Sequence, residues 1–312
     1  MKKSVLFFVI TLCSLGQSFG QFKMPKTEDW KIANTKPIIV LLLDDDNINS
    51  AIYNVNVKKY IEEYFGSDRI SKFLYKKEFD KAKKNNKGEY NFIGYDNTRV
   101  RPMRSNFDVR FSQFFFGISD KAFASNYGYL IDWSYNLDND GNWHKLTELD
   151  VKFAIHHFKK IIDYNLNVKE VEPLKKANEI TFKDMNPNVN ELKELTLLID
   201  KNMFNEKILK RLKESYKYKY EIVESSKIDE IVFSNQKGYA FIYPYFKPMA
   251  LVTSNIVYST DMYYIYKSED YTQLFNYIPK FEDNFLLGKK MKENMIDADL
   301  KNYFEKLNSV IE

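Results

Sequence analysis

Cysteine is almost absent from this 312-residue chain, and its scarcity excludes several kinds of chemistry. The single cysteine, Cys13, lies in a segment that we expect to be removed on export. The mature chain is therefore predicted to form no disulfide, to hold no thiolate-bound metal and to use no cysteine nucleophile. About 290 residues remain after removal, which is enough for two domains of ordinary size without disulfide support.

Histidines and known catalytic motifs are also scarce. The only histidines are His144, His156 and His157. The last two are adjacent on a predicted helix, where they point about 100° apart and do not easily share one metal ion. The chain has no phosphate-binding glycine loop, no Gly-x-Ser-x-Gly motif and no His-Glu-x-x-His motif. We therefore expect no cofactor and no metal, and we assign no catalytic residue.

Neither charge nor hydropathy indicates nucleic acid or a membrane span. Lysine and arginine exceed aspartate and glutamate by four, and by two once Lys2 and Lys3 are removed. A near-neutral balance gives no argument for a nucleic-acid partner. No segment after residue 20 approaches the roughly 20 consecutive apolar residues that span a bilayer. We expect no transmembrane segment after signal cleavage.

The first 20 residues have the three parts of a secretory signal. Lys2 and Lys3 form the charged start, residues 5–15 the apolar centre, and residues 18–20 a small-x-small cleavage site before Gln21. The chain is rich in Lys, Asn, Ile, Tyr and Phe, which is typical of an AT-rich bacterial genome. These features predict a periplasmic or secreted protein of a Gram-negative bacterium. An uncleaved tether is the alternative, and Leu12 disfavours lipid attachment at the following cysteine.

One pattern occurs twice. Residues 37–46 read PIIVLLLDDD and residues 192–201 read LKELTLLIDK, and an amphipathic segment follows each, at 50–65 and 203–216. A second strand, a short helix and further strands then follow in both halves. An apolar strand alternating with amphipathic helices is typical of an α/β fold with a buried sheet. The sequence therefore predicts two similar α/β domains with mixed sheets, in tandem from an internal duplication.

The same patterns predict the domain limits. The long helix over 146–165, with Thr147 as its N-cap, closes the first domain. In the second domain we expect the last strands at 239–243, 250–257 and 262–266. A C-terminal helix over 298–311 lies outside the repeat. The predicted parts are a signal peptide at 1–20, a linker at 21–36, domains at 37–166 and 192–312, and an interdomain linker at 167–191.

Several segments of the second half resemble a known arrangement. LTLLIDKNMFNEK, YKYEIVESSKIDE and KGYAFIYP contain the strand-helix start, the second strand with its helix, and the third strand, and LDVKFAIHHF forms the helix between the halves. This combination resembles uncharacterised exported proteins of the Bacteroidetes that join two such α/β modules. The resemblance covers most of the mature chain. It implies the architecture and export, and it implies no activity.

The acids after the first strand are the sharpest candidate site. Asp44, Asp45 and Asp46 follow LLL, and Asp200 follows the matching strand. Carboxylates beyond the carboxyl end of a parallel strand lie where α/β folds bind ligands. A strand ending in Asp-x-Asp also resembles the haloacid dehalogenase family, which implies magnesium-dependent phosphoryl transfer, but Ile48 and the lack of a later acidic pair depart from it. The alternative is that the acids cap the following helices.

Other groups have simpler interpretations. Residues 136–141 partly match a calcium loop, but the acid due at its last position is missing, and a hairpin turn fits better. Arg99, Arg101, Arg104 and Arg110 fit a solvated loop better than an anion site. Aromatic residues of the first half pack under a helix or form a partner surface. The predicted function is non-catalytic binding of an envelope protein or glycan, and the alternative is a magnesium-dependent hydrolase using Asp44 and Asp46.

Overall fold

The computed structural model describes residues 25–85, 88–100, 109–119, 129–137, 143–167, 186–251, 256–276 and 303–311. Its backbone divides into two units, one built on strands β1 to β5 and the other on β6 to β10. Each unit contains a five-stranded mixed sheet with helices. The predicted fold class, two α/β domains in tandem, is confirmed. None of the helices in the described ranges has the length and apolar character needed to cross a bilayer.

The first sheet is built around β1, whose five residues are all buried. A continuous β-branched and leucine run is typical of a strand covered on both faces. β1 runs parallel to β2 on one side and to β3 on the other, and β4 pairs antiparallel with β5. The strand order is β2-β1-β3-β4-β5. The strands are β1 at Ile38–Leu42, β2 at Ile70–Tyr75, β3 at Asn91–Val100, β4 at Val109–Ile118 and β5 at Ile131–Asn136.

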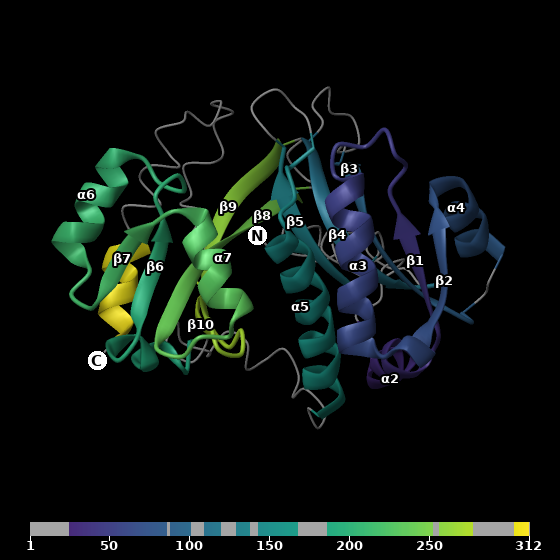
Figure 1. Ribbon diagram of the computed structural model, residues 1–312, viewed down its shortest axis with the longest axis horizontal. Helices are drawn as coiled ribbons and strands as arrows, with labels where there is room; N and C mark the ends of the chain where they lie inside the picture. The colour runs from purple at the N-terminus through teal and green to yellow at the C-terminus, as the bar shows by residue number, and fades with distance from the viewer. Residues whose placement is uncertain are drawn as a thin grey trace, which may run out of the picture. The chain divides into compact units, whose positions relative to one another are not determined.

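Helices cover both faces of this sheet. α3 and α5 lie side by side over one face, and α4 lies over the other (Figure 1). Two neighbouring residues of β4 show the division: Phe114 contacts Tyr53 of α3 at a ring distance of 6.0 Å, and Phe115 contacts Phe79 of α4 at 6.1 Å. The helices are α2 at Thr27–Thr35, α3 at Ser50–Phe65, α4 at Lys76–Asn85, α5 at Glu148–Asn167 and the short 3-10 helix η1 at Ser67–Arg69.

Local sequence signals set the limits of two of these helices. The Thr147 hydroxyl accepts a hydrogen bond from the Asp150 amide at 3.2 Å, and the Thr147 amide donates to the Asp150 carboxylate at 2.7 Å. This reciprocal capping box confirms Thr147 as the N-cap of α5. At the end of α3, Gly66 has a φ of +86°, a conformation that favours glycine.

The linker predicted over residues 21–36 contains a helix. Residues 27–35 form α2, which packs against α5 and buries Trp30 and Ala33. The amide of Asn91 donates to the carbonyls of Ile32, Ala33 and Lys36 at 3.0 to 3.1 Å, so the end of α2 is bound to the start of β3. The sequence predicted a linker here because the segment is short and polar, and its helical state depends on these distant partners.

The second sheet repeats the topology of the first. β6 runs parallel to β7 and β8, and β9 pairs antiparallel with both β8 and β10. The order β7-β6-β8-β9-β10 corresponds strand for strand to β2-β1-β3-β4-β5. The strands are β6 at Thr196–Asp200, β7 at Tyr220–Val223, β8 at Tyr239–Leu251, β9 at Ile256–Lys267 and β10 at Gln273–Asn276.

The strand limits at the end of the second unit differ from the prediction. The three predicted strands at 239–243, 250–257 and 262–266 are two long strands, β8 and β9, and β10 was not predicted. Pro244 and Pro248 suggest a break, but β8 pairs with β6 only over residues 239–241. Beyond that point one edge of β8 has no partner in β6, and an unpaired edge tolerates proline.

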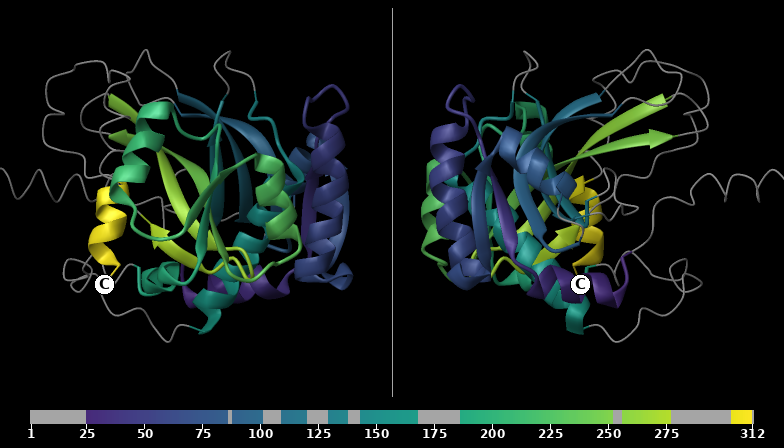
Figure 2. Two further views of the ribbon diagram at one scale, coloured as in Figure 1. Left: turned by 60° about the vertical axis from the view of Figure 1, so that its left-hand side comes forward. Right: turned by 90° about the vertical axis from the view of Figure 1, so that its right-hand side faces the viewer.

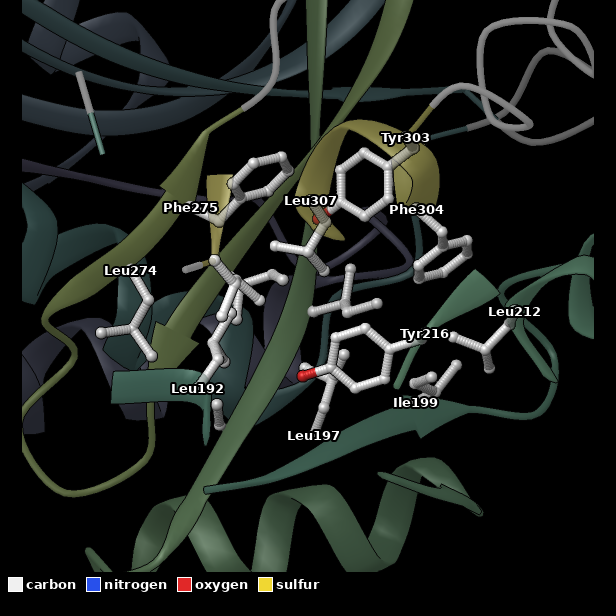
Figure 3. Close-up of a cluster of buried hydrophobic side chains, with 14 of the residues drawn as sticks. Leu192, Leu197, Ile199, Leu212, Tyr216, Leu274, Phe275, Tyr303, Phe304 and Leu307 are labelled. Carbon is white, nitrogen blue, oxygen red and sulfur yellow. The ribbon is translucent and has the colours of Figure 1, made fainter. Parts of the chain in front are cut away.

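A closing helix completes the second unit. Residues 303–310 are helical and share one apolar core with α6, Glu206–Ser215, to which Phe304 and Leu307 contribute from one side and Leu212 from the other (Figure 3). This helix is yellow in Figure 2. α7, Ser225–Phe233, and the 3-10 helix η3, Val189–Lys193, also belong to this unit. Because η3 buries Val189 and Leu192 in the same core, the predicted interdomain linker ends before residue 189.

The C-terminal helix belongs to the repeat, contrary to the prediction. In the first unit α5 follows the fifth strand and packs beside α3, the helix after the first strand. In the second unit the helix at 303–310 also follows the fifth strand and packs with α6, which follows the first. The repeated unit is therefore β-α-β-α-β-β-β-α, and each closing helix shields the same face of its sheet.

Candidate functional site

The topology of the first unit directs attention to the carboxyl end of β1. β1 lies between β2 and β3, and the helices that follow β1 and β2 cover opposite faces of the sheet. In open α/β sheets such a switch in winding leaves ligand-binding space beyond the strand ends. The loop over residues 43–49 lies at this position, and it contains three of the predicted site residues, Asp44, Asp45 and Asp46.

These three aspartates are exposed. No described residue gives their carboxylates a hydrogen bond or an ion pair, and the backbone carbonyl of Asp44 accepts from the Asn47 amide at 2.9 Å in an ordinary turn. The N-cap of α3 is Asn49, and no side chain caps this helix. The predicted capping role of the three acids is wrong, because the turn places them several residues before the first helical residue. Their side chains point to solvent as an uncompensated acidic cluster.

Asn49 anchors the loop to the beginning of α5. Its side chain is 2% exposed. The side-chain amide donates to the carbonyl of His144 at 2.8 Å, and the side-chain oxygen accepts from the amide of Leu146 at 2.9 Å. The Tyr95 hydroxyl donates to the same His144 carbonyl at 3.2 Å. One asparagine therefore joins two segments that lie about a hundred residues apart in the chain.

The remaining polar groups behind the loop also bind the backbone. The Tyr53 hydroxyl donates to the carbonyl of Leu41 at 3.0 Å. Asn54 accepts from the amide of Leu43 at 2.9 Å and donates to its carbonyl at 2.8 Å. Burial, and next the charge of Asp96, raise the pKa of Tyr53 well above its ordinary value, so the phenol stays neutral. These groups hold the strand end in place and offer no acid or base.

An ion-pair cluster lies on the α4 side of the same strand ends. Lys76 pairs with Asp96 at 2.7 Å and with Asp80 at 3.4 Å. The ammonium of Lys83 lies 4.8 Å from the ring centre of Tyr129, a cation–π contact. Burial, and next the charge of Lys76, lower the pKa of Lys83. The positive and negative charges of this cluster are matched, which is typical of a structural network.

A groove beside α4 offers a second place for a small ligand. It has a volume of about 340 Å³, an apolar floor that includes Ile39 and Leu74, and a rim with Lys72, Glu78 and Lys81. An apolar floor with a few polar groups is the usual composition of a small-molecule site. Its rim contains one acid and no histidine, so it presents no nucleophile paired with a base.

Asp200 does not occupy the position of Asp44. Aligning LLLD with LLID pairs Leu41 with Leu197, yet Leu41 packs under α4 while Leu197 packs under α6. α4 follows the second strand of its unit and α6 follows the first. A shift of one residue moves a side chain to the other face of a strand. The two strand ends therefore do not match letter for letter, and Asp200 is not the counterpart of Asp44.

The Asp200 carboxylate has local partners. One oxygen accepts from the Asn202 amide at 2.8 Å, and the other accepts from the hydroxyl of Ser225 at the start of α7. The helix that follows, α6, is capped by Asn205, whose side chain accepts from the Ile208 amide at 3.0 Å. Asp200 therefore links the end of β6 to α7, and the predicted capping of α6 by Asp200 is wrong. The four predicted site residues do not form one site.

The three histidines do not come together in one site. His156 contacts Tyr64 at a ring distance of 5.1 Å, whereas His157 contacts Trp133 at 4.8 Å, so the adjacent histidines have different surroundings as predicted. His144 stacks on Tyr135. Within the described ranges, no three acidic, histidine or cysteine side chains are close enough to hold a metal ion. Residues 138–142 of the proposed calcium loop and the side chains of Arg99, Arg101 and Arg104 lie outside the described residues.

Two features of this site were not predicted. The anchoring role of Asn49 was missed because its partners are distant in sequence, although its place just before an amphipathic helix gives a capping signal. The ion pairs of Lys76 connect the start of α4 to the middle of β3, and no local pattern indicates them. Comparison of the chain with protein-family models, with curated proteins and with solved structures found no match. The site therefore has to be interpreted from its own geometry.

Proposed function

We propose that this chain is an exported, non-catalytic binding protein of a bacterial cell envelope, periplasmic or secreted, whose partner is a protein or a glycan. The proposal draws on the signal-like first 20 residues, the resemblance to exported tandem α/β proteins and the absence of cysteine after Cys13. Each of its two α/β units provides a scaffold on which a binding surface can be placed.

One observation carries the non-catalytic part of this proposal. At the carboxyl end of β1, where α/β enzymes place their chemistry, the buried side chains of Asn49 and Tyr53 and the half-buried side chain of Asn54 are bound to backbone groups. The groups that remain available are the exposed carboxylates of Asp44 to Asp46. An exposed, unpaired acidic cluster supports recognition of a positively charged surface better than acid–base catalysis.

The alternative is a magnesium-dependent phosphatase-like hydrolase that uses Asp44 and Asp46. Its support is their position beyond the carboxyl end of β1. Such a site needs a lysine and a further carboxylate converging on the ion. Lys76, which directly follows the neighbouring strand β2, is paired with Asp96 and Asp80 on the α4 side of the sheet. The described residues therefore favour the binding function.

Export and enzymatic activity can be tested on one protein preparation. The full chain is expressed in a Gram-negative host, the cells are fractionated, and the N-terminus of the product is sequenced. We expect a periplasmic or released product that begins at Gln21. A cytoplasmic product that retains residues 1–20 would contradict export.

The purified chain is then assayed with p-nitrophenyl phosphate and magnesium, beside the Asp44→Asn variant. We expect no magnesium-dependent hydrolysis by either protein. Hydrolysis by the wild type that disappears in Asp44→Asn would favour the enzyme over the binding protein. Hydrolysis that is equal in both proteins would point to a contaminating phosphatase, and the assay would be repeated after further purification.

A further inference from the structure

The start of α3 presents apolar side chains to solvent. Ile48, Ile52 and Val55 are 62%, 41% and 66% exposed. Their spacing of four and three residues places them along one side of the helix and the turn before it. The opposite side of α3 buries its own apolar residues, Tyr53 and Val57 among them, in the core of the first unit. The exposed stripe is therefore additional to the packing that holds the helix on the sheet.

The second unit provides an internal control for this stripe. α6 occupies the place of α3 after the first strand of its unit. Its exposed positions are charged without exception: Glu206, Lys207, Lys210, Lys213 and Glu214. The same fold is thus built with a charged outer helix surface. The exposed isoleucines and valine of α3 are not a requirement of the architecture.

The acidic cluster lies beside this apolar stripe and is found only in the first of the two corresponding loops. Asp44 to Asp46 lie two to four residues before Ile48, at the end of the sheet where α3 begins (Figure 1). In the corresponding loop of the second unit, Asp200 is bound to Ser225 and Lys201 pairs with Glu224. The first unit therefore combines an apolar stripe with uncompensated negative charge, and the second unit has neither feature at that position.

We infer that residues 44–55 form a docking surface for a protein partner, and that the partner presents a segment in which lysine or arginine side chains lie beside large apolar side chains. This inference rests on the proposed binding function and specifies its surface. Negative charge of this density repels nucleic acid and anionic lipid surfaces, whereas it attracts a cationic segment. The apolar stripe then supplies area that becomes buried on docking.

The test uses a labelled synthetic amphipathic peptide of lysine and leucine as the probe, with two control peptides of glutamate and leucine and of lysine and serine. Binding to the full-length mature chain is followed by fluorescence anisotropy at low and high salt. We expect only the lysine–leucine peptide to bind tightly, and to bind more weakly as salt rises. Equal binding of the lysine–serine peptide would show a purely ionic contact and overturn the role of the stripe.

Three variants locate the surface. Asp44→Asn/Asp45→Asn/Asp46→Asn should weaken binding on the order of tenfold and remove most of its salt dependence. Ile52→Lys/Val55→Lys should weaken binding at least as much. Tyr164→Ser is the matched control, because Tyr164 is 69% exposed on α5 and lies outside the proposed surface. Binding that is unchanged in the first two variants, or that is lost equally in the control, would overturn the inference.

Other occupants give different results. A doubled molar mass in light scattering that is abolished by Ile52→Lys would assign the surface to self-association and overturn the proposed partner. Binding to vesicles of anionic lipid that depends on the same residues would assign the surface to a membrane and would also overturn the proposed protein partner. Envelope binding that persists in the variants would refute this surface and leave the proposed binding function standing, whereas failure of the intact chain to bind any envelope component would refute the function itself.

Discussion

Substitution of Asn49 by alanine tests whether the loop beyond β1 is held by its connection to α5. The change removes the hydrogen bonds from the side-chain amide to the His144 carbonyl and from the Leu146 amide to the side-chain oxygen. The His144 carbonyl keeps the hydroxyl of Tyr95 as a donor, at 3.2 Å. The Leu146 amide is left buried without a partner.

The expected cost follows from these two losses. A hydrogen bond between protein groups contributes about 1 kcal/mol net, and a buried donor without a partner costs roughly 1 to 3 kcal/mol. We therefore expect Asn49→Ala to lower the free energy of unfolding of the first unit by about 2 to 4 kcal/mol. The exposed neighbours of Asn49 in the loop should show much smaller effects.

Tryptophan fluorescence reads this effect selectively. All three tryptophans, Trp30, Trp133 and Trp143, lie in the first unit, so urea unfolding followed by their emission reports on that unit alone. Trp143 also precedes His144 directly, and its ring lies 5.4 Å from that of Tyr95. Loosening of the anchor should therefore change the native emission as well as the unfolding midpoint.

A second substitution separates the hydrogen bonds from the volume of the side chain. Asn49→Asp keeps the oxygen that accepts from Leu146 but turns a carboxylate oxygen toward the His144 carbonyl. Burial raises the folded-state pKa of such a carboxyl. The loss of unfolding free energy in Asn49→Asp should therefore be largest at neutral pH and should become smaller as the pH falls and the carboxyl is protonated. If Asn49→Ala costs less than about 0.5 kcal/mol, or if the aspartate variant shows no such dependence on pH, the anchoring role is refuted.

Four further expectations concern stability. Asn91→Ala should cost the first unit about 1 to 3 kcal/mol in the same assay, because hydrogen bonds to three carbonyls at the end of α2 are lost, although each carbonyl keeps a second donor in the Lys36 amide or the Arg69 guanidinium; an unchanged midpoint would argue against it. Asp45→Asn should change stability by less than about 0.5 kcal/mol, since its carboxylate is exposed, and a clear loss would restore the capping interpretation. Burial, and next the charge of the neighbouring histidine, lower the pKa of His157 to about 3. His157 of the unfolded chain takes up a proton near pH 6.5, whereas His157 of the folded chain does so only near pH 3. The first unit should therefore lose up to about 1.4 kcal/mol of stability per pH unit as the pH falls from 6.5 toward 3. The His157→Gln variant should show a smaller loss per pH unit, and an unaltered loss would mean that other groups cause it. Leu307→Ala should cost the second unit about 2 to 5 kcal/mol, measured as the urea transition in near-UV circular dichroism that tryptophan emission does not report, and a marginal effect would show that the closing helix is dispensable.

The sequence by itself determined the fold class and most of the elements that the structure describes. Apolar runs such as residues 38–42 identify buried strands, and the stripe of α5 with Thr147 before it identifies a capped helix. These signals are local, because periodicity and capping depend on residues within a few turns of one another. The repeated order of the elements also followed from the sequence, and with it the two-domain architecture.

The tertiary structure decided the features that depend on distant partners. Residues 27–35 are helical in the fold because Asn91 binds the end of α2 and α5 covers its apolar side. Similarly, Asn49 is an anchor because the chain returns at residues 144–146. A polar residue has the same local pattern whether its partner is a neighbour or a segment a hundred residues away, so the sequence alone could not distinguish these roles.

The alignment of the two halves also required the tertiary structure. Identical letters favour matching Asp44 with Asp200, but a strand alternates its side chains between two faces, so an error of one residue exchanges the faces. Only the packing of Leu41 under α4 and Leu197 under α6 showed that this match is wrong. The existence of a strand is encoded in its own residues, whereas the helices that pack on the two faces of the sheet determine which face each residue of the strand occupies.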